Sequence, residues 1–476
     1  MIRLQDVSFA FSSAGSSDAL SRVSLTVRDG EWIAVAGGNG SGKTTLCRII
    51  AGVARPLGGT VTVNDMENAF VKGAPCIPPA TGIAFQNPDS QFVTTSVERE
   101  LLFGMENLGF ESSEMKRRCV AAARLFGLEQ HLERNPHTLS GGEKQRTILG
   151  CLWALGPRHL VLDEPFSFLD SGARSAFLEA LRGTFRREGR SVVWSTVDSR
   201  EMELADRVVF LADGRVSFDG APGDLARSIP PDELDAALVC PGEKPGSGAG
   251  ASFRESRSGG PPAVDMRGAV LSPGPAGFVL RVPRLSIGAG ERVGVCGPSG
   301  SGKTTLLLAC AGLLPPREGD VAVLGARIKS RRDFPAGKIA FLFQCPEEGF
   351  FAPTVREEIA LAHRSFVGKG EEAASVADAI AGVGLSPGRF LERNPFRLSQ
   401  GEKRLVSLAS MLVIDAPLVC LDEPTIFLDG GARRSVVSAL ERLSARGATT
   451  VIASHDAAFL RECTDRIVTL ENGALV

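Results

Sequence analysis

The sequence of 476 residues contains no apolar run that reaches the roughly 18 residues needed to span a membrane as a helix. Its longest candidate, Leu306 to Leu314, predicts a buried helix. Ten cysteines are scattered without a Cys-x-x-Cys pair, which argues against structural zinc, iron–sulfur clusters and a disulfide framework, and fits a reducing cytoplasm. The net charge of −2 provides no overall basic field, so we expect no nucleic-acid partner.

What the sequence does contain is one set of nucleotide-handling motifs that occurs twice. Gly37–Thr44 fits the phosphate-loop pattern G-x-x-x-x-G-K-[ST], and Gly297–Thr304 fits it again. Two further segments recur in the same order, shifted by nearly the same number of residues. They are Leu139–Glu143 with Leu398–Glu402, and Leu162–Pro165 with Leu421–Pro424. This pattern indicates a tandem duplication of one ATP-binding domain.

Short apolar runs alternate with longer helical stretches in each half, as Ile33–Ala36 and His159–Leu162 illustrate. Such runs are typical of buried parallel strands, so the fold class is α/β with two tandem P-loop NTPase domains. We place the domains at residues 1–228 and 263–476. Residues 229–262 are rich in Gly, Pro and Ser and predict a flexible linker.

Each phosphate loop predicts a site for ATP and Mg²⁺. Free backbone N–H groups surround phosphate oxygens in front of a helix N-terminus. Lys43 and Lys303 would reach the β- and γ-phosphates, and the hydroxyls of Thr44 and Thr304 would bind the metal. The expected ATP-binding residues of the loops are Gly37, Asn39, Gly40, Ser41, Gly42, Lys43, Thr44 and Thr45, and Gly297, Ser299, Gly300, Ser301, Gly302, Lys303, Thr304 and Thr305.

An acidic pair ends an apolar strand in each half. Asp163 and Asp422 are expected beside the metal. Glu164 and Glu423 follow, where a water could be polarised for in-line attack on the γ-phosphate. Before each pair, a serine and a glycine open a helix and offer an anion site. These residues are Ser140 and Gly142, and Ser399 and Gly401.

The ordered set of motifs resembles the ATP-binding cassette (ABC) family, and the resemblance covers nearly the whole chain apart from the linker. In that family two domains pack head to tail, and each ATP lies between the phosphate loop of one domain and the signature serine of the other. The resemblance therefore implies an intramolecular cassette dimer, with one copy of the chain per complex. Site one would combine Lys43, Thr44, Gln86, Asp163 and Glu164 with Ser399 and Gly401, and site two would combine Lys303, Thr304, Gln344, Asp422 and Glu423 with Ser140 and Gly142. Gln86 and Gln344 match the family's metal-contacting glutamine.

The two halves depart from the family pattern at the switch histidine. His455 occupies this position in half two, whereas half one has Val197. None of the five histidines lies between His159 and His363, so no shift of the alignment supplies another. Valine cannot donate a hydrogen bond to a γ-phosphate.

Site one also faces an altered signature, in which Gln400 replaces a glycine. We therefore expect Glu423 and His455 to carry catalysis at site two, and Glu164 to support little hydrolysis at site one. At the adenine position the asymmetry is reversed, because Phe11 would stack on the base in half one and Leu271 occupies the position in half two.

The segment Phe85–Phe92 resembles the glutamine-loop signature of energy-coupling-factor (ECF) transporter ATPases, which drive uptake of vitamins and transition-metal ions. Phe343–Phe350 is a looser match. Capping boxes at Thr95-x-x-Glu98 and Thr354-x-x-Glu357 predict a helix after each loop. In the family this loop and helix form the face on which membrane coupling helices dock. The acids that could receive arginines from such a partner are Asp89, Glu347 and Glu348.

The resemblance implies an ATPase subunit on the cytoplasmic face of the membrane, with a transmembrane coupling subunit and a membrane substrate-binding subunit as partners. The alternative is a soluble twin-cassette translation factor on the ribosome, but such factors carry a long charged helical insert that the linker lacks. Another ABC transporter remains possible, although sugar importers usually have a degraded second phosphate loop. A DNA-repair ATPase would need paired cysteines for zinc, and this sequence has no such pair.

Overall fold

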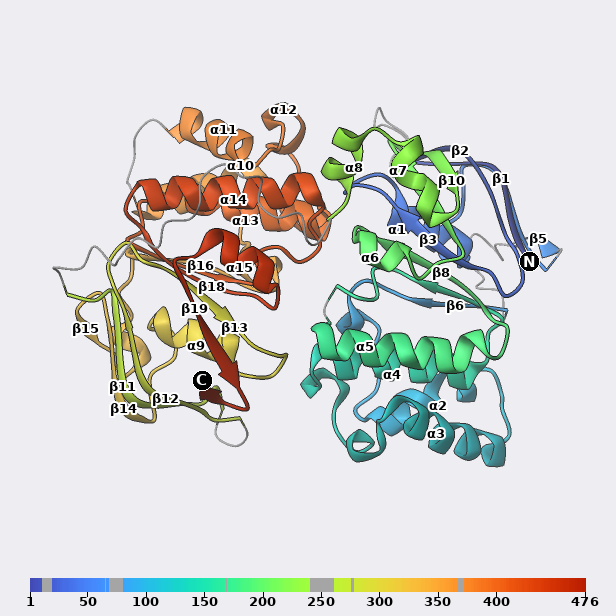
Figure 1. The fold of residues 1–476 in the computed structure, drawn as a ribbon, viewed down its shortest axis with the longest axis horizontal. Coiled ribbons are helices and arrows are strands. Elements are labelled where there is room, and N and C mark those ends of the chain that lie inside the picture. Colours follow the sequence, from blue (N-terminus) through green and yellow to red (C-terminus); the bar gives the residue numbers. More distant parts are fainter. Residues whose placement is uncertain are drawn as a thin grey trace. The chain divides into compact units, whose positions relative to one another are not determined.

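Apolar runs that alternate with helices build a parallel sheet in each half of the chain. The computed structural model describes residues 1–10, 19–64, 66–67, 80–167, 169–239, 261–274, 278–366 and 372–476. The chain divides into unit one, Met1–Pro241, and unit two, Gly242–Val476. The two units are shown as a ribbon in Figure 1.

In unit one the main sheet has the strand order β10-β9-β3-β8-β7-β6, and all neighbours except β10 and β9 run parallel. Its strands are β3 (Trp32–Ala36), β6 (Thr81–Ala84), β7 (His159–Leu162), β8 (Ser191–Thr196), β9 (Arg207–Ala212) and β10 (Arg215–Gly220). An antiparallel sheet with the order β2-β1-β4-β5 lies beside it. This sheet comprises β1 (Ile2–Phe9), β2 (Leu20–Val27), β4 (Gly58–Val63) and β5 (Met66–Glu67). The predicted buried parallel strands are confirmed.

Side chains alternate between the two faces of the parallel sheet along each strand, and both faces are buried against other elements. On β3, Trp32 and Ala34 pack into a cluster with the larger helices, whereas Ile33 and Val35 pack into a cluster with α1 and the antiparallel sheet. The helices are α1 (Lys43–Ile50), α2 (Val97–Asn107), α3 (Ser112–Phe126), α4 (Gly141–Leu155), α5 (Ser171–Ala180), α6 (Ser199–Met202), α7 (Leu225–Ser228) and α8 (Pro231–Ala237). Short 3₁₀ turns are η1 (Pro88–Ser90), η2 (Glu129–His131), η3 (Pro136–Thr138) and η5 (Pro222–Asp224), and a π-helix, η4 (Leu181–Arg186), continues α5.

Ordered structure in unit one continues past the predicted domain end at residue 228. Residues 231–237 form α8, and Val239 makes a parallel bridge to Asp198. Leu238 is buried in the core of unit one. The expected linker boundary at residue 229 was therefore wrong. Pro231 followed by two acids is a helix-start signal that the surrounding prolines obscured. The rest of the predicted linker, residues 240–260, lies outside the described residues.

Unit two repeats this arrangement, but its described strands form one continuous sheet, because β20 hydrogen-bonds to both β12 and β19. The strand order is β15-β14-β11-β12-β20-β19-β13-β18-β17-β16. The strands are β11 (Val264–Leu271), β12 (Leu280–Ile287), β13 (Arg292–Cys296), β14 (Glu318–Val323), β15 (Ala326–Arg327), β16 (Ile339–Leu342), β17 (Leu418–Asp422), β18 (Thr449–Ala453), β19 (Arg466–Glu471) and β20 (Ala474–Leu475).

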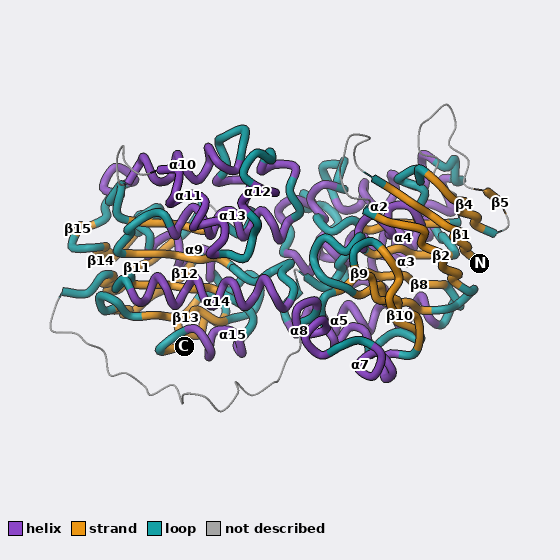
Figure 2. Tube along the Cα trace, turned by 90° about the horizontal axis from the view of Figure 1, so that it is seen from above, coloured by secondary structure: helices purple, strands orange, loops and turns teal. Residues whose placement is uncertain are grey.

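The helices of unit two also cover both faces of its parallel strands, as the orange strands and purple helices of Figure 2 show. They are α9 (Lys303–Cys310), α10 (Val355–Phe366), α11 (Glu372–Gly382), α12 (Pro387–Phe390), α13 (Gln400–Leu412), α14 (Gly430–Ala445) and α15 (Ala457–Cys463), with short turns η6 (Arg331–Asp333), η7 (Pro346–Gly349) and η8 (Pro395–Arg397). The predicted buried helix after the second phosphate loop is α9. Among the described residues, no helix is both long and apolar enough to cross a bilayer.

Candidate ATP sites

Each phosphate loop connects the central strand of its sheet to a helix, and its lysine folds back over the loop. In unit one the Lys43 Nζ donates to the carbonyl oxygens of Gly37 at 2.7 Å and Gly38 at 2.9 Å. In unit two the Lys303 Nζ donates in the same way, at 2.8 and 3.0 Å. Both lysines open a helix, so their ammonium groups lie at the positive end of the helix dipole. An anion of high charge is the ligand that would offset this concentration of positive charge.

The first glycine of each loop is required by close packing. A Cβ on Gly37 would lie 2.3 Å from the carbonyl oxygen of Leu211, and one on Gly297 would lie 2.4 Å from that of Leu470. Both glycines also have positive φ angles, of 144° and 154°. The buried hydroxyl oxygens of Ser41 and Ser301 make no hydrogen bond. Since buried hydroxyls usually find a partner, these oxygens favour a bound polar ligand in each loop.

The predicted metal residues meet at the ends of the parallel strands. The hydroxyl of Thr44 donates to the Asp163 carboxylate at 3.1 Å, and that of Thr304 donates to Asp422 at 2.6 Å. Burial raises the pKa of Asp422 to about 6 and also raises the pKa of Asp163. Hydroxyl and carboxylate oxygens suit Mg²⁺, which binds to few protein groups and takes the rest of its ligands from phosphate and water. Among the described residues, no group of three or more His, Cys, Asp and Glu side chains could hold a metal by itself.

The two glutamates after these aspartates have a strained backbone. Glu164 has a φ of 47° and Glu423 a φ of 49°, in the left-handed region that favours glycine. Both side chains are buried. Such strain persists where the surrounding structure enforces it, and it occurs often at active sites. The same unusual conformation in both units supports an active-site role for this position.

In unit two the Glu423 carboxylate is held by the segment after β18. The His455 backbone N–H and ring Nδ1 each lie 3.0 Å from it, and the Ser454 hydroxyl donates to it at 3.1 Å. Burial acts to raise the pKa of Glu423, but His455, Lys303 and Ser454 together outweigh burial and lower it. In return Glu423 raises the pKa of His455, although burial of the ring opposes this. Each group of the pair therefore stabilises the charged form of the other.

In unit one the contacts of the Glu164 carboxylate are different. It accepts hydrogen bonds from Gln86 Nε2 at 2.9 Å and from the Ser167 hydroxyl at 3.2 Å. Burial raises its pKa to about 7, with only partial compensation from Lys43. No positively charged group takes the place of His455, because the equivalent residue is Val197. Ser167 has no counterpart of the same type in unit two, where Ile426 stands, and sequence reasoning did not single it out.

Unit two has a further support for its glutamate that sequence reasoning missed. Arg404 is almost completely buried, and its guanidinium donates to the backbone carbonyl of Glu423 and, at 2.7 Å, to that of Gln344. Burial lowers the pKa of Arg404 to about 10. At the matching position of α4, unit one has Gln145, whose buried amide nitrogen has no partner. A comparison of the two α-helices after the signature motif, position by position, could have revealed this difference.

The signature serines begin their helices as expected. Ser140 and Ser399 each form a reciprocal capping box with a glutamate three residues later. The altered signature residue of unit two is Gln400. Its amide donates to Glu347 at 2.8 Å, so this side chain is bonded to the glutamine loop of its own unit. The composite sites, each of which would combine the phosphate loop of one unit with the signature serine of the other, remain predictions.

The glutamine loops differ from expectation in two respects. Asp89 already accepts from Lys144 at 2.8 Å, and Glu347 accepts from Lys403 at 2.7 Å, so these acids are paired within their own units. Ser96, rather than Thr95, caps α2 by accepting from a backbone N–H of its first turn. The predicted cap on the second helix is present, because Thr354 Oγ1 accepts from the N–H of Glu357 at 3.2 Å.

The two predicted adenine-stacking positions, Phe11 and Leu271, have different outcomes in the structure. Phe11 lies outside the described residues. Leu271 is fully buried in the core at the end of β11, which leaves no face for a base, and it matches Phe9 in strand pairing. The assignment of Leu271 to the base-stacking position is therefore wrong. Phe278 lies closer to the nucleotide loop, since a Cβ on Gly302 would lie 2.8 Å from its ring.

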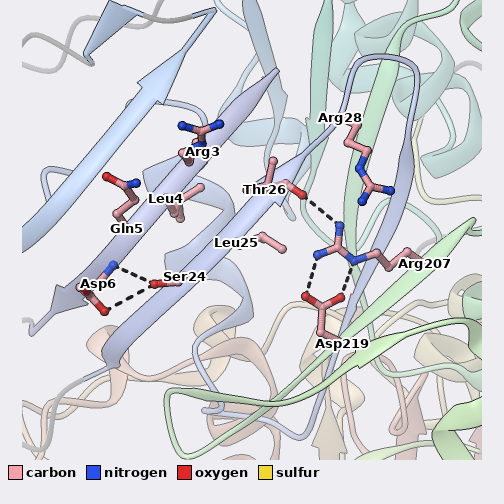
Figure 3. A pocket seen from close by; sticks show the side chains of 10 residues that line it. All are labelled: Arg3, Leu4, Gln5, Asp6, Ser24, Leu25, Thr26, Arg28, Arg207 and Asp219. Atoms are coloured by element: carbon pink, nitrogen blue, oxygen red, sulfur yellow. Dashed lines mark hydrogen bonds and ion pairs between the residues drawn. The ribbon is translucent and has the colours of Figure 1, made fainter.

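A separate cleft of about 830 Å³ lies in unit one, between β1 and β2 on one side and β9 and β10 on the other (Figure 3). Arg207 of β9 pairs with Asp219 of the neighbouring β10, and it donates across the cleft to the carbonyl of Thr26 at 3.0 Å. None of the predicted ATP-site residues lines this cleft. In unit two β20 joins the corresponding strands into one sheet.

A phosphate loop, an acidic pair at a strand end and a capped signature helix in each unit together define a twin-cassette P-loop ATPase. The chain belongs to the ABC transporter family, whose model matches residues 20–167 and 280–426. A provisionally named ABC transporter ATP-binding protein of Bifidobacterium longum is 32% identical over 98% of this chain, which spans 64% of that protein's length.

Two further similarities cover nearly the entire chain. A provisionally named ABC transporter ATP-binding protein of Methanosarcina mazei is 29% identical over the whole chain and 94% of its own length. Among solved structures, a model of ribosome-bound archaeal Pelota and ABCE1 aligns over 99% of this chain and 78% of its own, with a TM-score of 0.68 and 21% identity. At this identity the structural likeness supports the tandem-cassette fold alone.

Proposed function

We propose that this chain is the ATP-hydrolysing energy-coupling subunit of an ECF-type ABC importer for a vitamin or a transition-metal ion. The observation that carries the proposal is an exposed apolar side chain at the same position of both glutamine loops. Phe351 is 78% exposed and Val93 is 64% exposed. A large, exposed apolar side chain that recurs in a duplicated fold favours a partner surface.

These apolar side chains project from a fixed backbone. The buried carboxylate of Glu358 accepts the N–H groups of Phe351 and Ala352, each at 2.8 Å. In unit one Glu100 accepts the N–H of Thr94 at 2.9 Å and lies within bonding distance of the N–H of Val93. Because the loop is already ordered, little conformational entropy is lost when a partner binds.

Further exposed apolar residues extend each surface along the next helix. Phe103 of α2 and Leu361 of α10 occupy matching positions and are both exposed. The exposed carboxylate of Glu348 adds a negative charge beside Phe351. A partner helix with aliphatic and arginine side chains has the complementary chemistry. This surface is where the transmembrane coupling subunit would dock, with the chain peripheral on the cytoplasmic face and a membrane substrate-binding subunit beside it.

For hydrolysis we propose that site two does most of the work. When bound, Mg²⁺ would neutralise the phosphate charge beside Thr304 and Asp422. Glu423 would polarise the attacking water, since its carboxylate is kept ionised by His455. Lys303 would hold the phosphates. Site one would bind ATP through Lys43 and contribute little turnover, because no group there plays the part of His455.

The experiment is co-purification in mild detergent from cells that contain the native partners. Phe351→Ser combined with Val93→Ser should reduce recovery of membrane proteins and leave ATP binding unchanged. Leu57→Ser is the matched control, because Leu57 is 71% exposed and lies outside both loops. If the double variant recovers as much membrane protein as the control does, the proposed docking surface is contradicted.

Ribosome sedimentation in the same cells tests the second candidate, a twin-cassette factor that acts on the ribosome. If the chain sediments with ribosomes and never fractionates with membranes, the transporter proposal is wrong.

A further inference from the structure

The segment that follows β8 in unit one is bound by the last described residues of that unit. The N–H of Val239 donates to the carbonyl of Val197 at 2.7 Å. The carbonyl of Val239 accepts the N–H of Ser199 at 3.2 Å. These two bonds form a parallel bridge between Val239 and Asp198. Val239 therefore binds the residue before Asp198 and the residue after it, and so holds residues 197–199 in place.

Core packing keeps Val239 in this position. Leu238, its neighbour, is 3% exposed and belongs to the main hydrophobic cluster of unit one. Ala237 and Ile229, at either end of α8, are buried in the same cluster. Peeling residues 238–239 away would therefore expose apolar surface as well as break two hydrogen bonds.

The other side of the segment is held by α5. Arg174 binds Asp198 and Glu201, both at 3.1 Å, and the Thr196 hydroxyl also donates to Glu201. In unit two Arg433 keeps the first of these contacts, to Asp456 at 2.6 Å. However, Phe459 stands in place of Glu201, so the second ion pair is specific to unit one.

The equivalent segment of unit two is bound to the active site. The N–H and the ring of His455 both contact Glu423. Among the residues that the structure describes, no isolated bridge comparable to that of Val239 holds this segment. Position 455 can therefore respond to changes at Glu423, whereas position 197 is tied to the end of its own unit.

We propose that residues 238–239 are a strap that fixes the 197–199 segment of unit one and keeps site one in a non-cycling, ATP-holding state. The claim about turnover rests on the proposed function of the two sites. The claim about the strap does not, because it concerns unit one alone. Val239 immediately precedes the residues that lead to unit two, so the covalent connection between the units begins at this segment.

Amide hydrogen exchange on the full-length chain tests the strap. In the wild type, the Ser199 amide should be protected, and its exchange rate should not change when ATP and Mg²⁺ are added. Val239→Pro removes the donor to Val197 and should speed Ser199 exchange about 5- to 10-fold, the effect of one lost hydrogen bond. Val239→Ala keeps the N–H and should leave the rate unchanged. A Ser199 amide that exchanges like an open loop, or that responds to ATP, would overturn the strap even if Val239→Pro fails to fold.

Turnover at site one is measured after Glu423→Gln silences site two. In that background Val197→His with Val239→Pro should raise the residual ATPase rate more than Val197→His alone does. An equal rise in both variants would show that the strap does not limit site one. Full activity of Glu423→Gln itself would instead refute the proposed division of labour between the sites, and the exchange data would still decide on the strap.

Discussion

Replacement of Glu423 by Gln is the most direct test of the unequal sites. The variant keeps the size of the side chain but removes the negative charge that His455 and Ser454 now contact. A general base typically contributes about 10²–10⁴-fold to a rate. If site two carries most turnover, the loss for the whole protein should reach at least about 100-fold.

The matched variant Glu164→Gln should behave differently. In the wild type the Glu164 carboxylate contacts Gln86 and Ser167, and it lacks an imidazole partner. Loss of one preorganised donor at a reacting centre costs about 10²–10³-fold in rate, by analogy with oxyanion holes. Site one should then supply on the order of 1% of turnover or less, so Glu164→Gln should leave most of the activity.

The assay is steady-state phosphate release by the complex with its membrane partners, together with nucleotide binding by each variant. Both glutamine variants should still bind ATP, because Lys43 and Lys303 are unchanged. The reasoning is refuted if the two variants lose activity equally, or if Glu164→Gln loses more.

Three further predictions concern supporting residues. Arg404→Gln removes charge-assisted bonds to two backbone carbonyls and should lower the free energy of unfolding by about 3 kcal/mol in urea titrations. Burial raises the pKa of Glu201 from 4.5 to about 8, so wild-type stability should fall as pH rises through that window, and Glu201→Gln should flatten the pH dependence of Tm. Gln400→Gly should speed amide exchange in residues 346–350, since Glu347 loses one of its two hydrogen-bond partners. The matched control is Gly141→Gln at the equivalent position of unit one, which should leave exchange in residues 346–350 unchanged.

The parts of the fold that sequence reasoning predicted are those where chemistry demands a short contiguous pattern. A phosphate loop needs glycines at fixed spacing because backbone approaches within van der Waals distance, as at Gly37 and Gly297. A buried parallel strand needs a continuous apolar run because both its faces are covered. Local patterns of this kind are legible in one sequence without knowledge of tertiary contacts.

The parts that could not be predicted depend on which side chain meets which. Gln400 follows a signature serine, and only the tertiary structure shows its amide on Glu347. Thr95 and Ser96 are both plausible caps, and the path of the chain selects Ser96. Arg404 has no motif of its own, because its acceptors are backbone carbonyls from two distant segments.

Several differences between the units lie around the side chain and backbone of the proposed catalytic glutamate, Glu164 in unit one and Glu423 in unit two. Three residues that support Glu423 are replaced in unit one. His455 corresponds to Val197, Ser454 to Thr196, and Arg404 to Gln145. Thr196 bonds to Glu201 instead, and the buried amide nitrogen of Gln145 has no partner.

The loop lysine and the threonine–aspartate pair, by contrast, are the same in both units, although the loops differ where Gly38 and Asn39 correspond to Pro298 and Ser299. Random loss of function would damage the phosphate contacts as readily as the base, because substitutions in the loop are at least as disruptive as those behind the glutamate. Unit one keeps the lysine, threonine and aspartate of the predicted phosphate and metal site and changes the residues that support the glutamate. This is the pattern expected of a site that binds ATP and hydrolyses it slowly. The proposed strap at Val239 fits this pattern, since it restrains the segment that carries Val197, the counterpart of His455.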